Sequence, residues 1–240
     1  MMRFVLLVFF CVACVMNANG GRTPIIVPDT MAERVKACTI CHGAEDKVGR
    51  DAYYPRIAGK PQGYLFNQLR NFRDGRRYYQ PMVVLLENMS DEYLLEIAHY
   101  FSSLQLPYPT PEKFHILPEE TRLAEHLIYS GNPERGIPAC SACHGDTLMG
   151  TEPAIPGLLG LSRAYITAQL GGWRNGGIIR GQPSDCMSEI AKQLTDGEAN
   201  AIAKWLANQT VSGKPNPSNM LSPELAQRCR QNILENGGAK

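Results

Sequence analysis

Apolar residues recur with helical spacing along much of the chain. In the segments that begin at Tyr64 and Tyr165, they occupy positions i, i+1, i+4 and i+5, which form one face of an α-helix. Residues 119–129 are amphipathic in the same way, and a shorter helical pattern runs from residue 222 to residue 234. No alternating pattern of the kind typical of β-strands persists. The sequence therefore predicts an all-α chain whose helices are joined by long loops.

Polar residues mark where several of these helices begin. Thr30 and Glu33 have the spacing of a capping box and predict a helix that runs to about residue 42. Thr195 and Glu198 form the same pattern at the start of the final helix of the second copy, and Ser90 is the predicted N-cap of the corresponding earlier helix.

An internal repeat divides the chain. Residues 64–75 align with residues 165–176 at an offset of 101, and the segment after residue 90 aligns with the segment after residue 195 at an offset of 105. A proline-rich stretch at residues 106–111 separates the two copies and should be stiff and extended. We predict a first domain over residues 21–106, a linker over 107–116, a second domain over 117–210 and a tail over 211–240.

The N-terminus resembles an export signal. Arg3 precedes an apolar run from Phe4 to Met16, and small residues follow at Ala18 and Gly20. The run is about 13 residues long, whereas a membrane-spanning helix needs roughly 20, so an uncleaved anchor is the weaker alternative. A lipoprotein signal at Cys14 is also weaker. We expect residues 1–20 to be a signal peptide, cleaved near residue 20 on export to the periplasm.

Composition narrows the possible functions. The 240 residues are 44% hydrophobic and carry 24 Lys and Arg against 23 Asp and Glu, a net charge of +1. This composition excludes a disordered chain, and the near-neutral charge argues against a nucleic-acid partner.

Cysteine spacing supplies the main chemical signal. Cys38, Cys41 and His42 form a C-x-x-C-H motif, and Cys140, Cys143 and His144 form a second one. This motif attaches c-type haem: the thiols form thioethers to the porphyrin, and the histidine binds the iron. A structural zinc site would leave both histidines without a role, a thioredoxin-like redox pair needs a βαβ context, and a disulfide within C-x-x-C would be strained. We predict two covalently bound haem c groups.

Each haem iron also needs a second ligand. Met82 and Met187 align at the offset of 105 and lie eight residues before the caps Ser90 and Thr195. A thioether opposite an imidazole raises the reduction potential. Other methionines are predicted to fill the core, and the remaining histidines do not share a register, so ligation by two histidines is disfavoured.

Two further residue pairs occupy equivalent repeat positions around the predicted haems. A loop carbonyl at Pro55 and at Pro156 could accept a hydrogen bond from the haem-binding histidine, although an ordinary turn proline is the alternative. Arg73 and Arg174 could contact haem propionates, although a solvated helix face is an equal alternative.

These motifs together resemble the dihaem cytochrome c4 family over about residues 30–210. The resemblance rests on Cys38-x-x-Cys41-His42-Gly43 and Cys140-x-x-Cys143-His144-Gly145, on Tyr64-Leu65-x-x-Gln68-Leu69-x-x-Phe72-Arg73-x-Gly75-x-Arg77, and on Met82 and Met187. It implies two tandem cytochrome-c-like domains with the haems at their interface, and periplasmic electron transfer, often towards a terminal oxidase.

The resemblance also guides the expected partners. We expect an electron carrier rather than an enzyme, because both irons would be fully coordinated. Its partners would be redox proteins: a quinol–cytochrome c reductase, a terminal oxidase or a periplasmic dehydrogenase. Any membrane association would come through them. The alternative is the dihaem subunit of a larger dehydrogenase complex such as flavocytochrome sulfide dehydrogenase. Cys186 and Cys229 are not family features that the resemblance covers, and in an exported chain they could form a disulfide.

Overall fold

The computed structural model describes residues 27–43, 52–176, 185–213, 216–218 and 221–228. The predicted signal peptide lies outside the described residues. So does Cys229, the expected disulfide partner of Cys186; Cys186 itself is disulfide-bonded.

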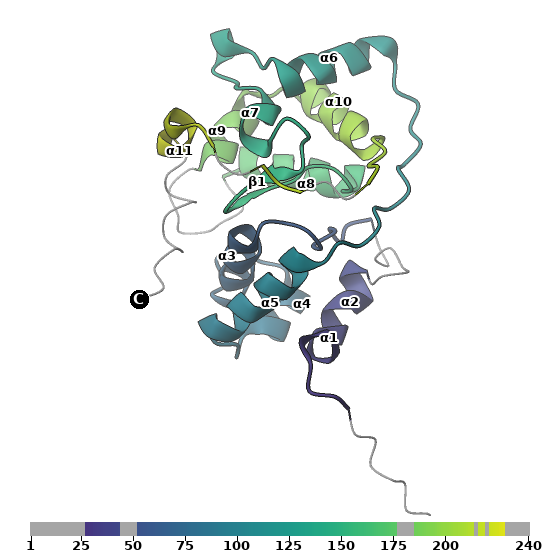
Figure 1. The fold of residues 1–240 in the computed structure, drawn as a ribbon. Coiled ribbons are helices and arrows are strands. Elements are labelled where there is room, and N and C mark those ends of the chain that lie inside the picture. The colour runs from purple at the N-terminus through teal and green to yellow at the C-terminus, as the bar shows by residue number, and fades with distance from the viewer. Residues whose placement is uncertain (1–26, 44–51, 177–184, 214–215, 219–220, 229–240) are drawn as a thin grey trace, which may run out of the picture.

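The first half of the chain packs its helices around one hydrophobic core (Figure 1). Helix α3 lies against α5, and α4 packs on α3. Val35, Leu86 and Leu94 are almost fully buried at the centre. The helices are α1 (Met31–Arg34), α2 (Lys36–His42), α3 (Gln62–Arg73), α4 (Gln80–Leu86) and α5 (Asp91–Ser103).

The second half forms a separate core, which includes Leu127, Ile128, Trp205 and Leu206. Helix α10 packs on α6 and α8, and α8 packs on α9. The elements are α6 (Pro118–Tyr129), the 3-10 helix η1 (Pro133–Arg135), α7 (Cys140–His144), β1 (Gly150–Thr151), β2 (Ile155–Pro156), α8 (Arg163–Arg174), α9 (Cys186–Gln193), α10 (Asp196–Ala207) and α11 (Pro223–Arg228). Two cores match the mostly helical, two-domain expectation, while the predicted domain boundaries stay a prediction.

The helix caps predicted from the sequence are present. The Ser90 hydroxyl accepts a hydrogen bond from the Tyr93 N–H at 3.3 Å. Thr195 and Glu198 form a reciprocal capping box at the start of α10. Thr30 accepts from the Glu33 N–H at 3.3 Å, but the helix that follows is interrupted at Val35, which is 1% exposed in the first core.

The second half also contains one short β-ladder within the mostly helical fold. Strands β1 and β2 form a short antiparallel pair in which Gly150 lies opposite Pro156 and Thr151 opposite Ile155. Two residues per strand are too few to produce a readable alternation in the sequence.

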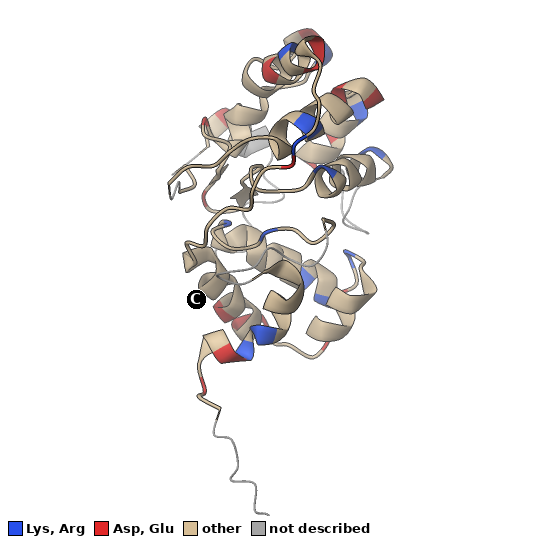
Figure 2. Ribbon diagram, turned by 90° about the vertical axis from the view of Figure 1, so that its right-hand side faces the viewer, with Lys and Arg blue, Asp and Glu red and all other residues tan. Residues whose placement is uncertain are grey.

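Among the described residues, no helix is both long and apolar enough to cross a membrane. Figure 2 shows Lys and Arg together with Asp and Glu on both halves of the molecule, in keeping with the near-neutral charge. Association with a partner would therefore depend on local patches rather than on net charge.

Candidate functional site

Each C-x-x-C-H motif occupies a short helix. Cys38, Cys41 and His42 lie on α2, and Cys140, Cys143 and His144 make up the ends of α7. Both helices end at a glycine with positive φ, 89° at Gly43 and 81° at Gly145. These are conformations that a side chain would strain, so the glycine lets the chain turn away directly after the histidine.

The two histidines are held in the same way. The carbonyl oxygen of Pro55 accepts a hydrogen bond from Nδ1–H of His42 at 2.8 Å, and that of Pro156 accepts one from Nδ1–H of His144 at 2.7 Å. These are the contacts expected from the sequence. A proton on Nδ1 leaves Nε2 with a free lone pair, which is the arrangement that a metal-binding imidazole requires.

Burial sets the protonation state of these groups. It lowers the pKa of His144 to about 4 and also lowers the pKa of His42. Both imidazoles are therefore neutral at pH 7 and able to bind a metal. Burial likewise raises the pKa of the Cys140 thiol to about 11 and raises the pKa of Cys38. Both free thiols are therefore protonated at pH 7.

A single cavity of about 780 Å³ joins the two halves. Its walls are mainly apolar and include Leu65, Ile97 and Leu206. They include all eight residues predicted to attach or bind the two haems: Cys38, Cys41, His42, Met82, Cys140, Cys143, His144 and Met187. Pro55 and Pro156 line the same cavity. The residues therefore fit a pair of porphyrins, because thiols, neutral imidazoles and thioethers converge on one apolar space.

The two methionines come from equivalent helices. Met82 lies in the first turn of α4, and Met187 lies in the first turn of α9. Met149 is 3% exposed and does not line the cavity, whereas Met89 lines it and also packs against the first core. The assignment of Met82 and Met187 as iron ligands stays a prediction that their place in the cavity wall supports.

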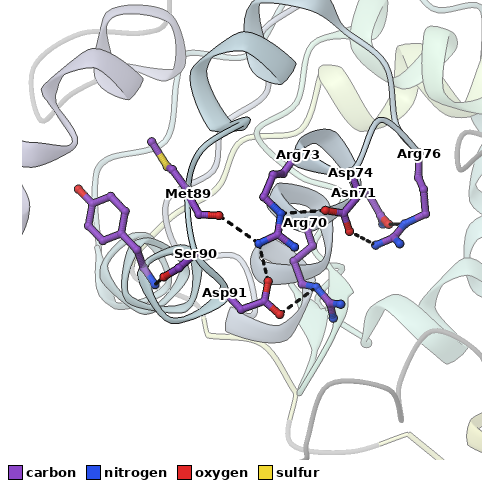
Figure 3. Close-up of polar contacts among 9 residues, drawn as sticks. Arg70, Asn71, Arg73, Asp74, Arg76, Met89, Ser90 and Asp91 are labelled. Atoms are coloured by element: carbon purple, nitrogen blue, oxygen red, sulfur yellow. Dashed lines mark hydrogen bonds and ion pairs between the residues drawn. The ribbon is translucent and has the colours of Figure 1, made fainter.

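The structure places Arg73 and Arg174 away from the cavity. The Arg73 guanidinium binds the Met89 carbonyl at 3.1 Å and the Asp91 carboxylate at 2.5 Å, as Figure 3 shows. Arg174 makes the equivalent contacts, to the Leu194 carbonyl at 2.5 Å and to Asp196. Neither arginine lines the cavity wall. The structure therefore does not bring these arginines to the cavity wall, where a contact with haem propionates was suggested. Each arginine instead links the end of its own helix, α3 or α8, to the start of α5 or α10. There a carboxylate in the first turn is a strong acceptor.

Other cations reach the cavity where the two halves meet. Arg77 donates to Gln68 at 2.6 Å within its own half, and to Gln169 at 2.9 Å and Tyr165 at 3.2 Å in the other half. Lys60 is 5% exposed and donates to the Gly157 carbonyl of the second half at 2.5 Å. The sequence pattern predicts no role at the joint for Arg77 or Lys60. The only sequence signal for Lys60 is that its repeat partner is the apolar Leu161.

The zinc alternative has no support in the described part of the chain. There, no group of three or more His, Cys, Asp or Glu side chains is arranged to hold a metal ion. A tetrahedral zinc site needs four such ligands, so each C-x-x-C-H motif lacks the additional donors that zinc would require.

Comparison with known proteins places these features in context. No family model matches the chain. A "Thiosulfate dehydrogenase electron acceptor" from Thiomonas intermedia is 37% identical over 73% of this chain and 80% of that protein. A "Cytochrome c4" from Pseudomonas aeruginosa is 31% identical over 74% of this chain and 87% of that protein.

Solved structures give the same picture. Reduced cytochrome c4 from Pseudomonas stutzeri superposes with a TM-score of 0.64 and 26% identity, covering 74% of this chain and 95% of that chain. Thiosulfate dehydrogenase from Marichromatium purpuratum superposes with a TM-score of 0.60 and 27% identity, covering 71% of this chain but only 36% of that chain.

Proposed function

The chain belongs to the dihaem cytochrome c4 family, and from this premise we propose that it accepts electrons from a thiosulfate dehydrogenase in the periplasm and passes them towards a terminal oxidase. Membership in the family gives the general function, electron transfer by two covalently attached haem c groups. The source and destination of the electrons and the roles of individual residues are the proposal.

The observation that carries the proposal is the shared cavity. Both C-x-x-C-H motifs and both aligned methionines line it, although they come from segments about 100 residues apart. We assign Cys38 and Cys41 to the first haem, with His42 and Met82 as its iron ligands. Cys140 and Cys143 attach the second haem, with His144 and Met187 as its ligands. When bound, each haem supplies a reversible one-electron couple.

The residues of this chain set how that couple works. The Pro55 and Pro156 carbonyls fix the orientation of the two imidazoles and increase their basicity. The two methionines supply soft sulfur ligands that favour the ferrous state. The apolar cavity wall limits the access of water, which keeps both ligands in place in both oxidation states. Two such ligands would leave the iron no open position for a substrate, so we propose that the chain does no catalysis of its own.

Relatives support the proposed electron donor. The relative that is 37% identical is named as the electron acceptor of a thiosulfate dehydrogenase, and a second one, from Stutzerimonas stutzeri, carries the same name at 36% identity. The mature chain has a formal net charge of zero once Arg3 is removed with the predicted signal, so contact with the enzyme would rely on local surface features.

A second candidate is a permanent electron-transfer subunit of such an enzyme. It is favoured by the solved thiosulfate dehydrogenase, in which the region similar to this chain covers 36% of a longer chain. A stable subunit would purify together with a larger polypeptide, whereas a soluble carrier would purify alone.

The test is a reconstituted electron transfer. Purified ferric protein is mixed with thiosulfate and a thiosulfate dehydrogenase, and haem reduction is followed by visible absorption in a stopped-flow instrument. Rapid reduction that needs both components supports the proposal. Reduction by flavocytochrome sulfide dehydrogenase with sulfide, and none by thiosulfate dehydrogenase, would reject thiosulfate dehydrogenase as the donor. Size-exclusion chromatography of the native preparation separates carrier from subunit.

A further inference from the structure

Lys60 is a buried cation at the joint between the two halves. Its side chain lies in the loop before α3 and is 5% exposed. The ammonium donates to the Gly157 carbonyl across the joint at 2.5 Å. In the described part of the chain it forms no ion pair with a carboxylate. A buried charge without a counter-ion is costly. Because water is excluded around it, its effect on nearby groups is only weakly screened.

The hydrogen bond to Gly157 places the charge of Lys60 beside the second half. Gly157 directly follows Pro156, whose carbonyl holds His144. The contacts from Lys60 to Gly157 and from His144 to Pro156 place the ammonium beside the loop that holds the residue assigned to bind the second iron.

The repeat supplies no matching cation for the first half. Pro55 aligns with Pro156 and Gly59 with Gly160, so Lys60 aligns with Leu161. Leu161 lines the cavity as well, and it packs against the second core. The two haem sites thus differ at this position by one buried positive charge.

We infer that Lys60, contributed by the first half, raises the reduction potential of the haem in the second half and makes the two haems inequivalent. Burial and the neighbouring Arg56 lower the pKa of Lys60 to about 7, so the side chain is mostly charged at pH 6. A positive charge at this place stabilises the reduced iron, which carries one positive charge fewer than the oxidised iron. A unit charge that acts over about 12 Å through an effective dielectric constant of about 20 changes an equilibrium about tenfold. Electrons that enter at the first haem would accordingly settle on the second. Lys60 is a positioning residue for electrons and takes no part in bonding to the iron.

The experiment measures the two midpoint potentials in the purified two-haem protein, without any partner. Redox titrations are followed by NMR, and the signals of the second haem are assigned as those altered in Met187→His. Two variants are compared with the unchanged protein at pH 6. Lys60→Gln removes the charge but keeps a donor for the Gly157 carbonyl, and Lys60→Met removes both. Lys204→Gln is the matched control, because this lysine also lies in an interhelix contact but pairs with Glu120 outside the cavity wall.

The expected result is the same in both Lys60 variants. At a fixed potential, the ratio of reduced to oxidised second haem falls about tenfold, equivalent to about 59 mV for a one-electron couple. The first haem shifts much less, and Lys204→Gln changes neither. The inference is overturned if both haems shift equally, or if neither shifts. It is also overturned if only Lys60→Met has an effect, because the hydrogen bond rather than the charge would then be responsible. Lys60→Gln preserves the side-chain volume and the donor, so it gives the answer even if Lys60→Met does not mature. A failed thiosulfate assay would leave this measurement unaffected.

Discussion

Gly63 allows the two halves to approach each other at the joint. It lies in the first turn of α3, and its N–H donates to the Pro153 carbonyl of the second half at 3.0 Å. A Cβ atom at this position would lie 2.7 Å from the same carbonyl oxygen. Real Cβ atoms do not approach backbone oxygen so closely, so Gly63→Ala must push the halves apart or distort one of them.

The size of the effect follows from three contributions. Overpacking of this kind costs about 1–3 kcal/mol. Loss of the hydrogen bond costs about 1 kcal/mol. Alanine returns up to about 1 kcal/mol through its higher helix propensity. The sum is a destabilisation of about 1–3 kcal/mol, which for a chain of this size lowers the Tm by about 2–12 °C.

Gly171→Ala is the matched control. Gly171 lies in the interior of α8, and a Cβ atom there would have no other atom within 4 Å. The same substitution should therefore stabilise the protein by about 1 kcal/mol through helix propensity alone, a rise in Tm of about 2–4 °C. Both variants are measured by differential scanning calorimetry on protein that carries two haems. A Gly63→Ala protein as stable as the unchanged protein would show that the halves do not meet at this contact in solution.

Three other outcomes are expected. The Arg135 guanidinium lowers the pKa of the Glu198 carboxyl to about 2, well below its unfolded value of about 4.3, so this pair stabilises the fold above about pH 4 and its contribution is lost as the pH falls towards 2. Thermal unfolding at pH 6 and pH 3 should accordingly show a smaller loss of Tm on acidification for Glu198→Gln than for the unchanged protein, and an equal loss would refute the pairing. Arg73→Gln should lower the Tm but leave both midpoint potentials in place, because this arginine holds α5 and does not line the cavity; a shift in one potential would restore the propionate contact. Met82→Ala should lower one midpoint potential only, since loss of the sulfur ligand destabilises the ferrous state of a single haem, and equal shifts at both haems would contradict separate ligand sets.

Much of the fold could be predicted because it depends on local patterns. Caps such as Ser90 and Thr195 act within three residues of their own position, so their hydrogen bonds can be read from the sequence. The offset of the repeat likewise paired Met82 with Met187, which were expected on loops, and the structure places them in the first turns of α4 and α9. The hydrogen bonds of Pro55 and Pro156 followed from the same comparison, because each follows its histidine at nearly the same distance along the chain.

Tertiary contacts explain what the sequence did not reveal. The repeat correctly predicts that Arg73 and Arg174 share an environment, but it does not say which acceptor lies nearest. In both cases the arginine binds a carboxylate and a carbonyl near the start of α5 or α10. The first helix is interrupted at Val35, whose side chain is buried in the core, and local helix propensity does not predict this break. Lys60 could not be placed from the sequence, because the Gly157 carbonyl to which it donates belongs to the other half.

The distribution of matched and unmatched residues around the cavity argues against two independent carriers in one chain. The features proposed to hold each haem are matched between the halves: a helix with a C-x-x-C-H motif, a prolyl carbonyl that accepts a hydrogen bond from the histidine, and a helix that carries a methionine. The features that differ lie where the halves meet: Lys60 has the apolar Leu161 at the equivalent repeat position, and Arg77 donates to Gln169 of the other half. Because both sets of proposed haem-binding residues line one cavity, a charge placed there by one half would act on the other. Duplication alone would give two equal sites, so it is the unmatched residues at the joint that can give the electron a preferred direction through the molecule.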